Sequence, residues 1–351
     1  MGLLVYASLY PFAEWRDQGI LPFGFLWQPW PKYWTGFDVA INVAGYAPFG
    51  FLLATGALRS ARGRHAVLMA ALAAGLVSLL LETLQNYLPS RVASNVDWVL
   101  NALGGWLGAV LAVLLERMGA LARWSLIRQR WFVTDARGGL VLLCLWPVAL
   151  LFPAAVPLGL GQVMERLEAT LAGLLQDTPF LAWLPVREVE LQPLIPAAEL
   201  ICVLLGALIP CLLGYCIIRS APRRALFSIG IIAAGIAATA LSWALSYGPA
   251  HAWGWFGLPA QVGVGAALFL AMVLLPLPHR VCAALVLLGV GIYLAVLNQA
   301  PTSPYFAQTL HTWEQGRFIR FNGLAQWLGW LWPYGTLVYV LALVGGRGTK
   351  N

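Results

Sequence analysis

The sequence predicts an all-α membrane protein, a polytopic transmembrane helical bundle with nine or ten spans. Of its 351 residues, 60% are hydrophobic and only 10% are charged, and the mean hydropathy is +0.77. Soluble globular proteins carry about 25% charged residues, so the bilayer is the solvent that fits this composition. The net charge of +7 does not indicate a nucleic-acid partner, because the basic residues form short clusters between apolar stretches.

Nine apolar stretches are close to the roughly 20 residues that a helix needs to cross the hydrocarbon core. They cover residues 37–58, 65–86, 97–118, 138–160, 197–218, 226–246, 258–278, 281–298 and 322–344. A tenth segment, residues 2–12, is apolar but too short to span by itself. It lacks the basic n-region and the A-x-A site of a cleaved signal peptide, so we expect a short, tilted or truncated first helix.

The positions of Lys and Arg predict how the helices cross the membrane. When the helices are threaded alternately, the loops on one side receive 14 of the 21 basic residues and the other side receives seven. Because cytoplasmic loops carry the excess of Lys and Arg, the first side is predicted to be cytoplasmic and to hold the C-terminus. Twelve of the 14 acidic residues fall at or beyond the opposite, outer face.

Loop lengths divide the chain into three parts. Three closely spaced helices form a first domain over residues 1–118, and a basic cytoplasmic connector follows over 119–137. Residues 138–351 form a six-helix membrane domain with an outer loop at 161–196. An apolar stripe at helical spacing runs through that loop, at Val163, Leu167, Leu171 and Leu174. It predicts an amphipathic helix that lies either on the outer leaflet or against the bundle.

Two predicted helices begin with the same polar pattern, [ST]-x-x-D-x-x-x-N-x-x-G. The pattern occurs with Thr35, Asp38, Asn42 and Gly45, and again with Ser94, Asp97, Asn101 and Gly104. A hydroxyl and a carboxylate three residues apart form a capping box, so each aspartate is either a helix cap or a functional group. Each asparagine lies one turn deeper, where it bonds across helices or contacts a ligand.

Glu82 is harder to explain as a structural residue. It lies near the outer, C-terminal end of the helix at 65–86, where the helix dipole disfavours a carboxylate. Charged residues within membrane spans are costly and mark either function or a paired structural site. Gln85 shares its helix face, and the following turn supplies Arg91, either as an ion-pair partner for Glu82 or Asp97 or as a ligand for phosphate.

The three helix ends open toward the same side, so we expect one polar pocket beneath the outer surface. Its candidate catalytic residues are Glu82, Asp97 and Asp38, and its candidate substrate-binding residues are Arg91, Gln85, Asn42 and Asn101. Three carboxylates and one guanidinium would repel one another if all were ionised, so one carboxyl should stay protonated or a divalent cation should bind. No His or Cys is nearby to favour zinc. A site without metal or cofactor is expected, with Mg²⁺ or Ca²⁺ as the alternative.

Three strings of residues run through this region in a fixed order. They are Asp38…Asn42…Gly45-Tyr46-Ala47-Pro48-Phe49-Gly50, then Glu82-x-x-Gln85-x-x-x-Pro89-x-Arg91, then Asp97-x-x-x-Asn101-x-x-Gly104. Together they resemble the VanZ-like membrane protein family over about residues 1–118. Near the C-terminus the chain reads Trp313-Glu314-Gln315-Gly316-Arg317, then Gly323-Leu-Ala-Gln-Trp-Leu-Gly-Trp-Leu-Trp-Pro333, and in this part it is similar to the long VanZ-like proteins of Gram-negative bacteria. Many members have His shortly after the first Asp, where this chain has Asn42, so any role of that His is in doubt here.

The resemblance implies a bacterial inner-membrane protein of the cell envelope, linked to glycopeptide antibiotic resistance or exopolysaccharide production, and supplies no reaction. We expect the periplasm-facing pocket to bind or act on a lipid-linked envelope glycan or polysaccharide precursor, with Glu82 as acid or base and Arg91 as phosphate clamp. One alternative is a transporter or flippase of that precursor. Another is a non-catalytic scaffold for envelope assembly proteins, which would use the outer loops 161–196 and 299–321 with Arg317 and Arg320. Membrane lipids are partners in each case.

Overall fold

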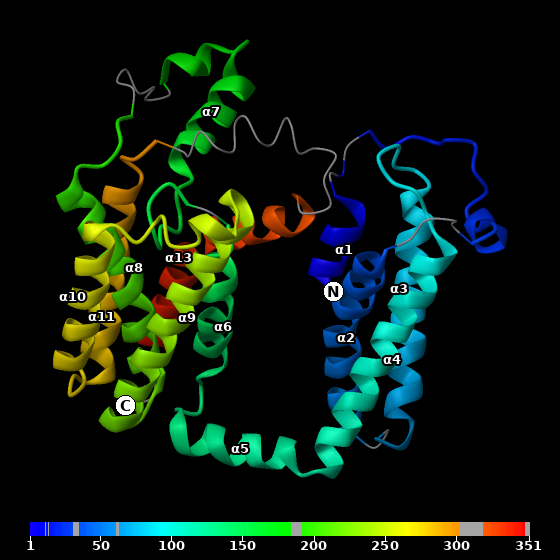
Figure 1. The fold of residues 1–351 in the computed structure, drawn as a ribbon, viewed down its shortest axis with the longest axis horizontal. Helices are drawn as coiled ribbons and strands as arrows, with labels where there is room; N and C mark the ends of the chain where they lie inside the picture. The colour runs from blue at the N-terminus through cyan, green and yellow to red at the C-terminus, as the bar shows by residue number, and fades with distance from the viewer. Residues whose placement is uncertain are drawn as a thin grey trace. The chain divides into compact units, whose positions relative to one another are not determined.

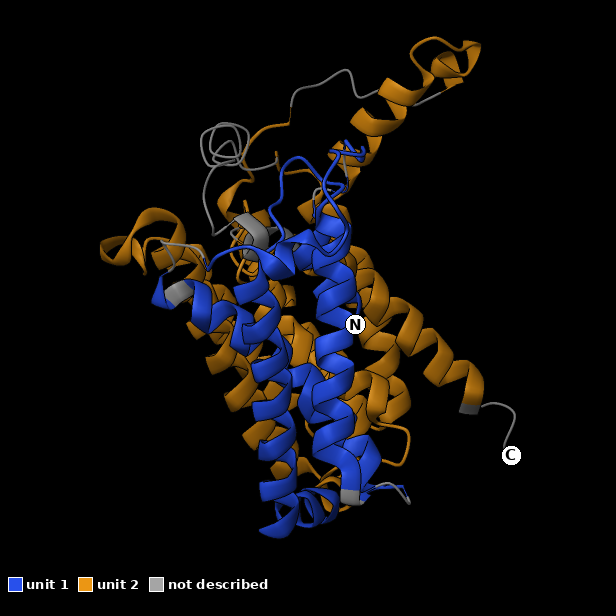
Figure 2. Ribbon diagram, turned by 90° about the vertical axis from the view of Figure 1, so that its right-hand side faces the viewer, with its two compact units in different colours: residues 1–127 blue, residues 128–351 orange. Residues whose placement is uncertain are grey.

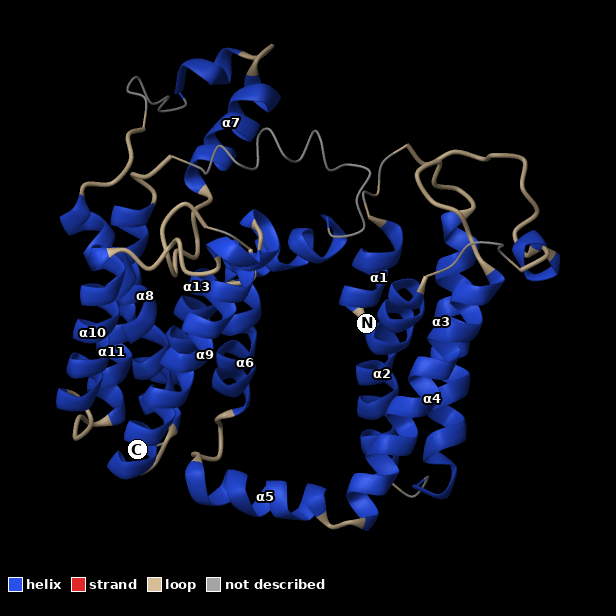
Figure 3. Ribbon diagram, viewed as in Figure 1, coloured by secondary structure: helices blue, strands red, loops and turns tan. Residues whose placement is uncertain are grey.

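The computed structural model describes residues 1–10, 12, 14–30, 35–60, 63–152, 154–183, 191–301 and 319–347. Within these ranges the chain forms 12 α-helices and no β-sheet, with one isolated bridge between Phe132 and Ile218 (Figure 1, Figure 3). The predicted all-α class is confirmed.

The chain forms two compact units, residues 1–127 and 128–351 (Figure 2). The boundary falls inside the predicted connector 119–137, where helix α5 (Ala120–Trp131) lies. Unit 1 contains α1 (Gly2–Leu9), η1 (Gly24–Trp27), α2 (Gly36–Leu58), η2 (Gly63–His65), α3 (Ala66–Gln85) and α4 (Asn95–Arg117). Unit 2 contains α6 (Arg137–Ala149), α7 (Met164–Leu175), η3 (Pro179–Trp183), α8 (Pro196–Ile217), α9 (Ala221–Tyr247), η4 (Pro249–His251), α10 (Leu258–Val273), α11 (His279–Leu297) and α13 (Ile319–Arg347).

Seven helices in the described part of the chain are long and apolar enough to cross a membrane, namely α2, α3, α4, α8, α9, α11 and α13. Two more, α6 and α10, are apolar but have only 13 and 16 residues. At about 1.5 Å per residue they are roughly 20 and 24 Å long, shorter than a hydrocarbon core of about 30 Å. The chain is a multi-pass membrane protein, and nine or ten spans stays a prediction.

The predicted stretch 138–160 is helical only as far as Ala149. After the helix the chain turns, with Leu158 in the left-handed region at φ 58°. The hydroxyl of Tyr293 on α11 holds this segment, because it donates to the carbonyl oxygen of Leu158 at 2.7 Å and accepts the N–H of Leu160. The apolar residues here are buried without being helical, a difference that hydropathy does not detect.

The first apolar segment, 2–12, forms the short helix α1. Its eight residues extend about 12 Å, so α1 does not cross a bilayer by itself. Leu9 at its end packs with Leu81 and Leu88 from the end of α3 and the turn that follows. A short first helix was predicted, and the structure shows what it packs against.

The interface between α2 and α4 depends on glycines at close approach. A Cβ atom added at Gly108 would lie 2.7 Å from the carbonyl carbon of Ala47, and one added at Gly104 would lie 2.9 Å from the Cα of Val43. Real carbon atoms pack at about 3.5–4.0 Å, so only glycine fits at these positions. Small residues of this kind let membrane helices approach closely. They bring the polar starts of α2 and α4 together.

Helix α7 is the predicted amphipathic helix of the outer loop. The Oδ1 atom of Asn298, which follows α11, accepts the backbone N–H groups of Val163 and Met164 at 3.2 and 3.1 Å. The start of α7 is therefore attached to unit 2. No residue of α7 is buried, and Leu167 and Leu174 are 50% and 72% exposed. This exposure favours the interfacial position over packing against the bundle.

Candidate functional site

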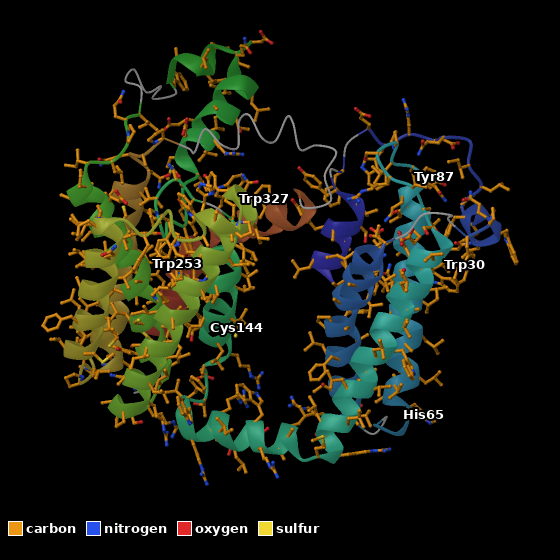
Figure 4. All side chains as sticks on the ribbon, in the orientation of Figure 1. Trp30, His65, Tyr87, Cys144, Trp253 and Trp327 are labelled. Atoms are coloured by element: carbon orange, nitrogen blue, oxygen red, sulfur yellow. The ribbon has the colours of Figure 1, made fainter. Side chains whose placement is uncertain are left out.

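The predicted polar residues lie at one end of the three long helices of unit 1. Tyr87, which follows α3, marks this end in Figure 4, and His65, which precedes α3, marks the opposite end. The residues are Asp38 and Asn42 on α2, Glu82 and Gln85 on α3, Arg91 in the turn, and Asp97 and Asn101 on α4. The structure assigns them three different environments.

Asp38 serves its own helix. Its Oδ2 atom accepts hydrogen bonds from the backbone N–H of Thr35 at 2.9 Å and from the Thr35 hydroxyl at 2.8 Å. In return, the backbone N–H of Asp38 donates to the Thr35 hydroxyl at 3.3 Å. This reciprocal pair is a capping box that stabilises the start of α2, as the local sequence predicted.

Asp97 has the same local sequence and a different partner. The Ser94 hydroxyl accepts the backbone N–H of Asp97 at 3.3 Å, which caps α4. The side chain of Asp97 turns toward α2, where its Oδ1 atom accepts a hydrogen bond of 2.8 Å from Nδ2 of Asn42. This bond joins residues 55 positions apart. Asn42 thus bonds across helices, one of the two predicted alternatives.

Glu82 is buried, with 3% of its surface exposed. Its Oε2 atom accepts the backbone N–H of Ser94, the N-cap residue of α4, at 3.0 Å. The start of a helix carries partial positive charge, so a carboxylate that is badly placed for α3 is well placed for α4. The charges of Asp97 and Arg91 also act on it. Sequence reasoning missed the contact with Ser94, although the short turn between α3 and α4 requires their ends to lie side by side.

Arg91 and Gln85 contact the end of α1. The Arg91 guanidinium donates from Nε and Nη2 to the carbonyl of Tyr10 at 2.9 and 2.6 Å, and from Nη2 to that of Ala7 at 3.1 Å. Gln85 donates from Nε2 to the carbonyl of Ser8 at 3.2 Å. The last carbonyls of a helix lack partners within it and carry partial negative charge, so a cation stabilises them. Arg91 and Gln85 therefore attach α1 to the domain, a role that the sequence did not indicate.

Asn101 lies deeper and is only partly satisfied. Its Nδ2 atom donates to the hydroxyl of Ser78 on α3 at 3.0 Å, while its Oδ1 atom is buried without a hydrogen-bond partner among the described residues. The hydroxyl of Tyr46 on α2 is also buried; Ser78 and Ser8 lie close enough to interact with it, but neither forms a hydrogen bond of good geometry with it. Tyr46 was not predicted as a site residue. Its position four residues after Asn42 places it on the same helix face, which was the available signal.

Residues 1–116 match the protein-family model described as VanZ/LLP1. They form a VanZ/LLP1 domain. No curated protein and no solved structure matches the chain. The matched segment ends in the last turn of α4, two residues before the domain end predicted from the sequence. The polar end of α2, α3 and α4 therefore lies within the VanZ/LLP1 domain.

The described residues of the VanZ/LLP1 domain do not bring three His, Cys, Asp or Glu side chains together as a metal site. Of the three predicted carboxylates, Asp38 is engaged in its own helix cap, while the Glu82 carboxylate and the backbone N–H of Asp97 both hydrogen-bond to Ser94. The group that converges consists of Glu82, Asp97, Asn42, Asn101, Tyr46 and Ser78, which we call the inner polar cluster. It offers two carboxyl groups, amides and hydroxyls within one helical domain.

Proposed function

We propose that the inner polar cluster binds the sugar hydroxyls of a lipid-linked cell-envelope glycan or polysaccharide precursor. The observation that carries the proposal is Oδ1 of Asn101, which is buried and has no hydrogen-bond partner among the described residues, with the buried Oη of Tyr46 beside the same Ser78 that Asn101 contacts. A buried polar atom without a partner costs free energy, and such atoms persist at functional sites more readily than in packed structural regions. In a membrane domain the cost is highest, because lipid offers no hydrogen bonds.

The cluster favours hydroxyl groups over phosphate as ligands. Two carboxyl groups repel an anion, whereas a carboxylate or an amide oxygen accepts a hydrogen bond from a hydroxyl. Arg91, the predicted phosphate clamp, directs its guanidinium to the carbonyls of Tyr10 and Ala7. The proposal therefore assigns recognition to the glycan part of the molecule and leaves its lipid part in the bilayer.

Glu82 is the proposed acid or base in the catalytic form of this function. It is buried beside a second carboxyl group, that of Asp97, an environment in which one carboxyl group can hold a proton that the other lacks. In the binding-only form, the same two groups orient sugar hydroxyls without proton transfer. The location that fits both forms is the inner membrane of a bacterium, with the cluster facing the periplasm and the C-terminus in the cytoplasm. The distribution of Lys and Arg supports this orientation.

The test compares two carboxylates that differ in their surroundings. Glu82→Gln keeps an oxygen that accepts the Ser94 N–H, so we expect folded protein at an unchanged level and loss of the envelope phenotype, measured as glycopeptide susceptibility or exopolysaccharide yield. Asp38→Asn is the matched control, because Asp38 belongs to a helix cap, and it should keep the phenotype. Full activity of the Glu82→Gln protein would contradict the proposal.

A transporter or flippase of the same precursor is the second proposed function, and one observation favours it. The buried, non-helical segment that follows α6 lies within unit 2 and is held by Tyr293. Irregular backbone at membrane depth occurs where it is buried in protein or lines a cavity, as in the broken helices of transporters. In this reading α6 and that segment cross the membrane together, and α10 completes nine spans. Flux of labelled precursor in vesicles carrying the purified protein, lost in a Tyr293→Phe variant, would support it.

The scaffold alternative rests on the outer loops. Leu174 and Trp183 are 72% and 80% exposed, which suits a protein contact or a lipid surface. Arg317 lies outside the described residues, and the side chain of Arg320 is likewise not described. A crosslinking group placed at position 183 that captures an envelope assembly protein in cells would support the scaffold function over the glycan-binding function.

A further inference from the structure

Each end of helix α5 lies next to the end of a candidate membrane span. It begins three residues after α4 ends at Arg117, and Gly119 between them has φ +71°, a conformation that turns the chain sharply. At the other end Phe132 pairs with Ile218, the residue that follows α8. Two backbone bonds flank this pair, from Val133 N–H to Ile217 at 2.9 Å and from Arg219 N–H to Trp131 at 3.0 Å. Each end of α5 is therefore held where a span ends.

The sequence of α5 gives the helix an apolar ridge between two basic flanks. Trp124, Ile127 and Trp131 follow the i, i+3, i+7 spacing of one helix face. Arg123 and Arg130 lie along one flank of the ridge and Arg128 along the other. No acidic residue occurs in the helix.

The ridge is largely uncovered by the rest of the protein. Trp124 and Ile127 are 51% and 45% exposed, and no residue of α5 is buried. Trp131 is the exception, since the Arg223 guanidinium lies 5.7 Å from its ring centroid and donates a hydrogen bond to the Arg130 carbonyl. These contacts hold the C-terminal end of α5 and leave the first two turns of the ridge open.

Further arginines extend the positive charge beyond the helix. Arg219 donates from Nε to the carbonyl of Phe132 at 2.8 Å, and Arg223 lies over Trp131 as described, so both cations are fixed beside the end of α5. Between positions 117 and 137 the sequence holds five arginines and one acidic residue, Asp135. The surface of α5 and its surroundings is therefore strongly basic.

We propose that α5 lies in the plane of the membrane face and binds anionic phospholipid headgroups. A ridge of Trp and Ile matches the boundary between headgroups and acyl chains, where the indole ring is favoured. Arginines on both flanks extend from that depth to the phosphate layer and bind it with charge-assisted hydrogen bonds. This surface is distinct from the inner polar cluster, which lies at the other end of α4, and the proposal does not depend on the cluster's function.

The test measures which lipids the purified full-length protein retains. The protein in mixed micelles of anionic and zwitterionic phospholipid should retain anionic lipid preferentially, as measured by native mass spectrometry. The triple change Arg123→Gln, Arg128→Gln and Arg130→Gln should lower the affinity for anionic lipid on the order of 100-fold, since each surface arginine contributes about fivefold. The corresponding triple change to Lys should keep the preference, because it keeps the charge.

A control separates this helix from general basicity of the protein. Arg16→Gln and Arg166→Gln remove two exposed arginines that the predicted topology places on the opposite membrane face, and this variant should retain anionic lipid like the unaltered chain. Equal loss in this control, or loss in the Lys variant, would overturn the proposal, as would full retention in the Gln variant. If the triple Gln variant does not fold, Arg128→Gln alone should lower the affinity for anionic lipid about fivefold. An unchanged affinity in that variant would also overturn the proposal.

Discussion

The close approach of α2 and α4 at Gly108 predicts how much one added methyl group should cost. A Cβ atom at position 108 would lie 2.7 Å from the carbonyl carbon of Ala47, which is backbone and cannot rotate away. The carbonyl oxygen of Ala47 lies nearer still, so the two helices have to separate by at least about 0.8 Å to restore ordinary contacts of about 3.5 Å. Overpacking of this kind costs about 1–3 kcal/mol, so Gly108→Ala should lower the free energy of unfolding by that amount.

The same separation should disturb the inner polar cluster. The hydrogen bond from Asn42 to Asp97 is 2.8 Å long and joins the same two helices. Lengthened by about 0.8 Å, it would exceed the limit of a hydrogen bond. Gly108→Ala is therefore expected to reduce the envelope phenotype as well as stability. Stability is measured by unfolding in mixed detergent micelles, followed by tryptophan fluorescence, and function is measured in the same cells.

Gly45→Ala on α2 is the matched control. A Cβ atom there would meet no atom within 4 Å, so the change adds a methyl group to the same helix without a clash. Because Ala is a better helix former than Gly by up to about 1 kcal/mol, this variant should be as stable as the unaltered protein or more stable. Equal unfolding curves for Gly108→Ala and Gly45→Ala would refute the close approach of α2 and α4.

Three further substitutions test individual contacts. Arg91→Ala leaves the carbonyls at the end of α1 without their buried donor and should cost about 3 kcal/mol, with faster proteolysis of α1 as the local readout. Ser94→Ala removes the cap of α4 and should cost about 1 kcal/mol in unfolding, while the backbone bond to Glu82 and the phenotype remain. Tyr46→Phe removes a buried hydroxyl that has no hydrogen bond of good geometry among the described residues, so the protein should be as stable or about 1 kcal/mol more stable while the phenotype is lost; a loss of stability with normal function would contradict the proposed role.

The sequence predicted those features of the site that depend only on residues close together in the chain. The capping box of Thr35 and Asp38 is complete within four residues, so the pattern alone was sufficient. The same pattern at Ser94 and Asp97 left two alternatives for the aspartate, and there the Ser94 hydroxyl caps the helix while the Asp97 carboxylate bonds to Asn42. The difference arises because the start of α2 is exposed, whereas the start of α4 packs against neighbouring helices. No pattern within one helix contains that information.

The helices were predicted correctly where an apolar stretch of the sequence has the same bounds as a helix. Stretches such as 65–86 and 197–218 match α3 and α8 closely, because each is apolar throughout and lacks an early turn. The prediction of a helix over 138–160 was wrong beyond Ala149. The second half of this stretch is apolar but irregular, and a hydroxyl from α11 stabilises it. Hydropathy shows that a segment is buried away from water, whereas the tertiary contacts determine its backbone conformation.

The polar residues of the VanZ/LLP1 domain form two groups: those whose hydrogen bonds stabilise the fold, and those with polar atoms that lack such bonds in the described structure. Arg91 and Gln85 hold α1, and their loss is expected to weaken the domain. Tyr46 and Asn101 carry atoms for which the described structure provides no hydrogen bond, so the fold does not benefit from their polarity. Natural proteins keep such locally unfavourable groups mainly where function requires them, and a stabilising substitution that abolishes activity is the expected signature. If the proposed function holds, recognition lies at the level of Asn101, one turn into α4 from its start, and Arg91 contributes indirectly by attaching α1 to this end of the domain.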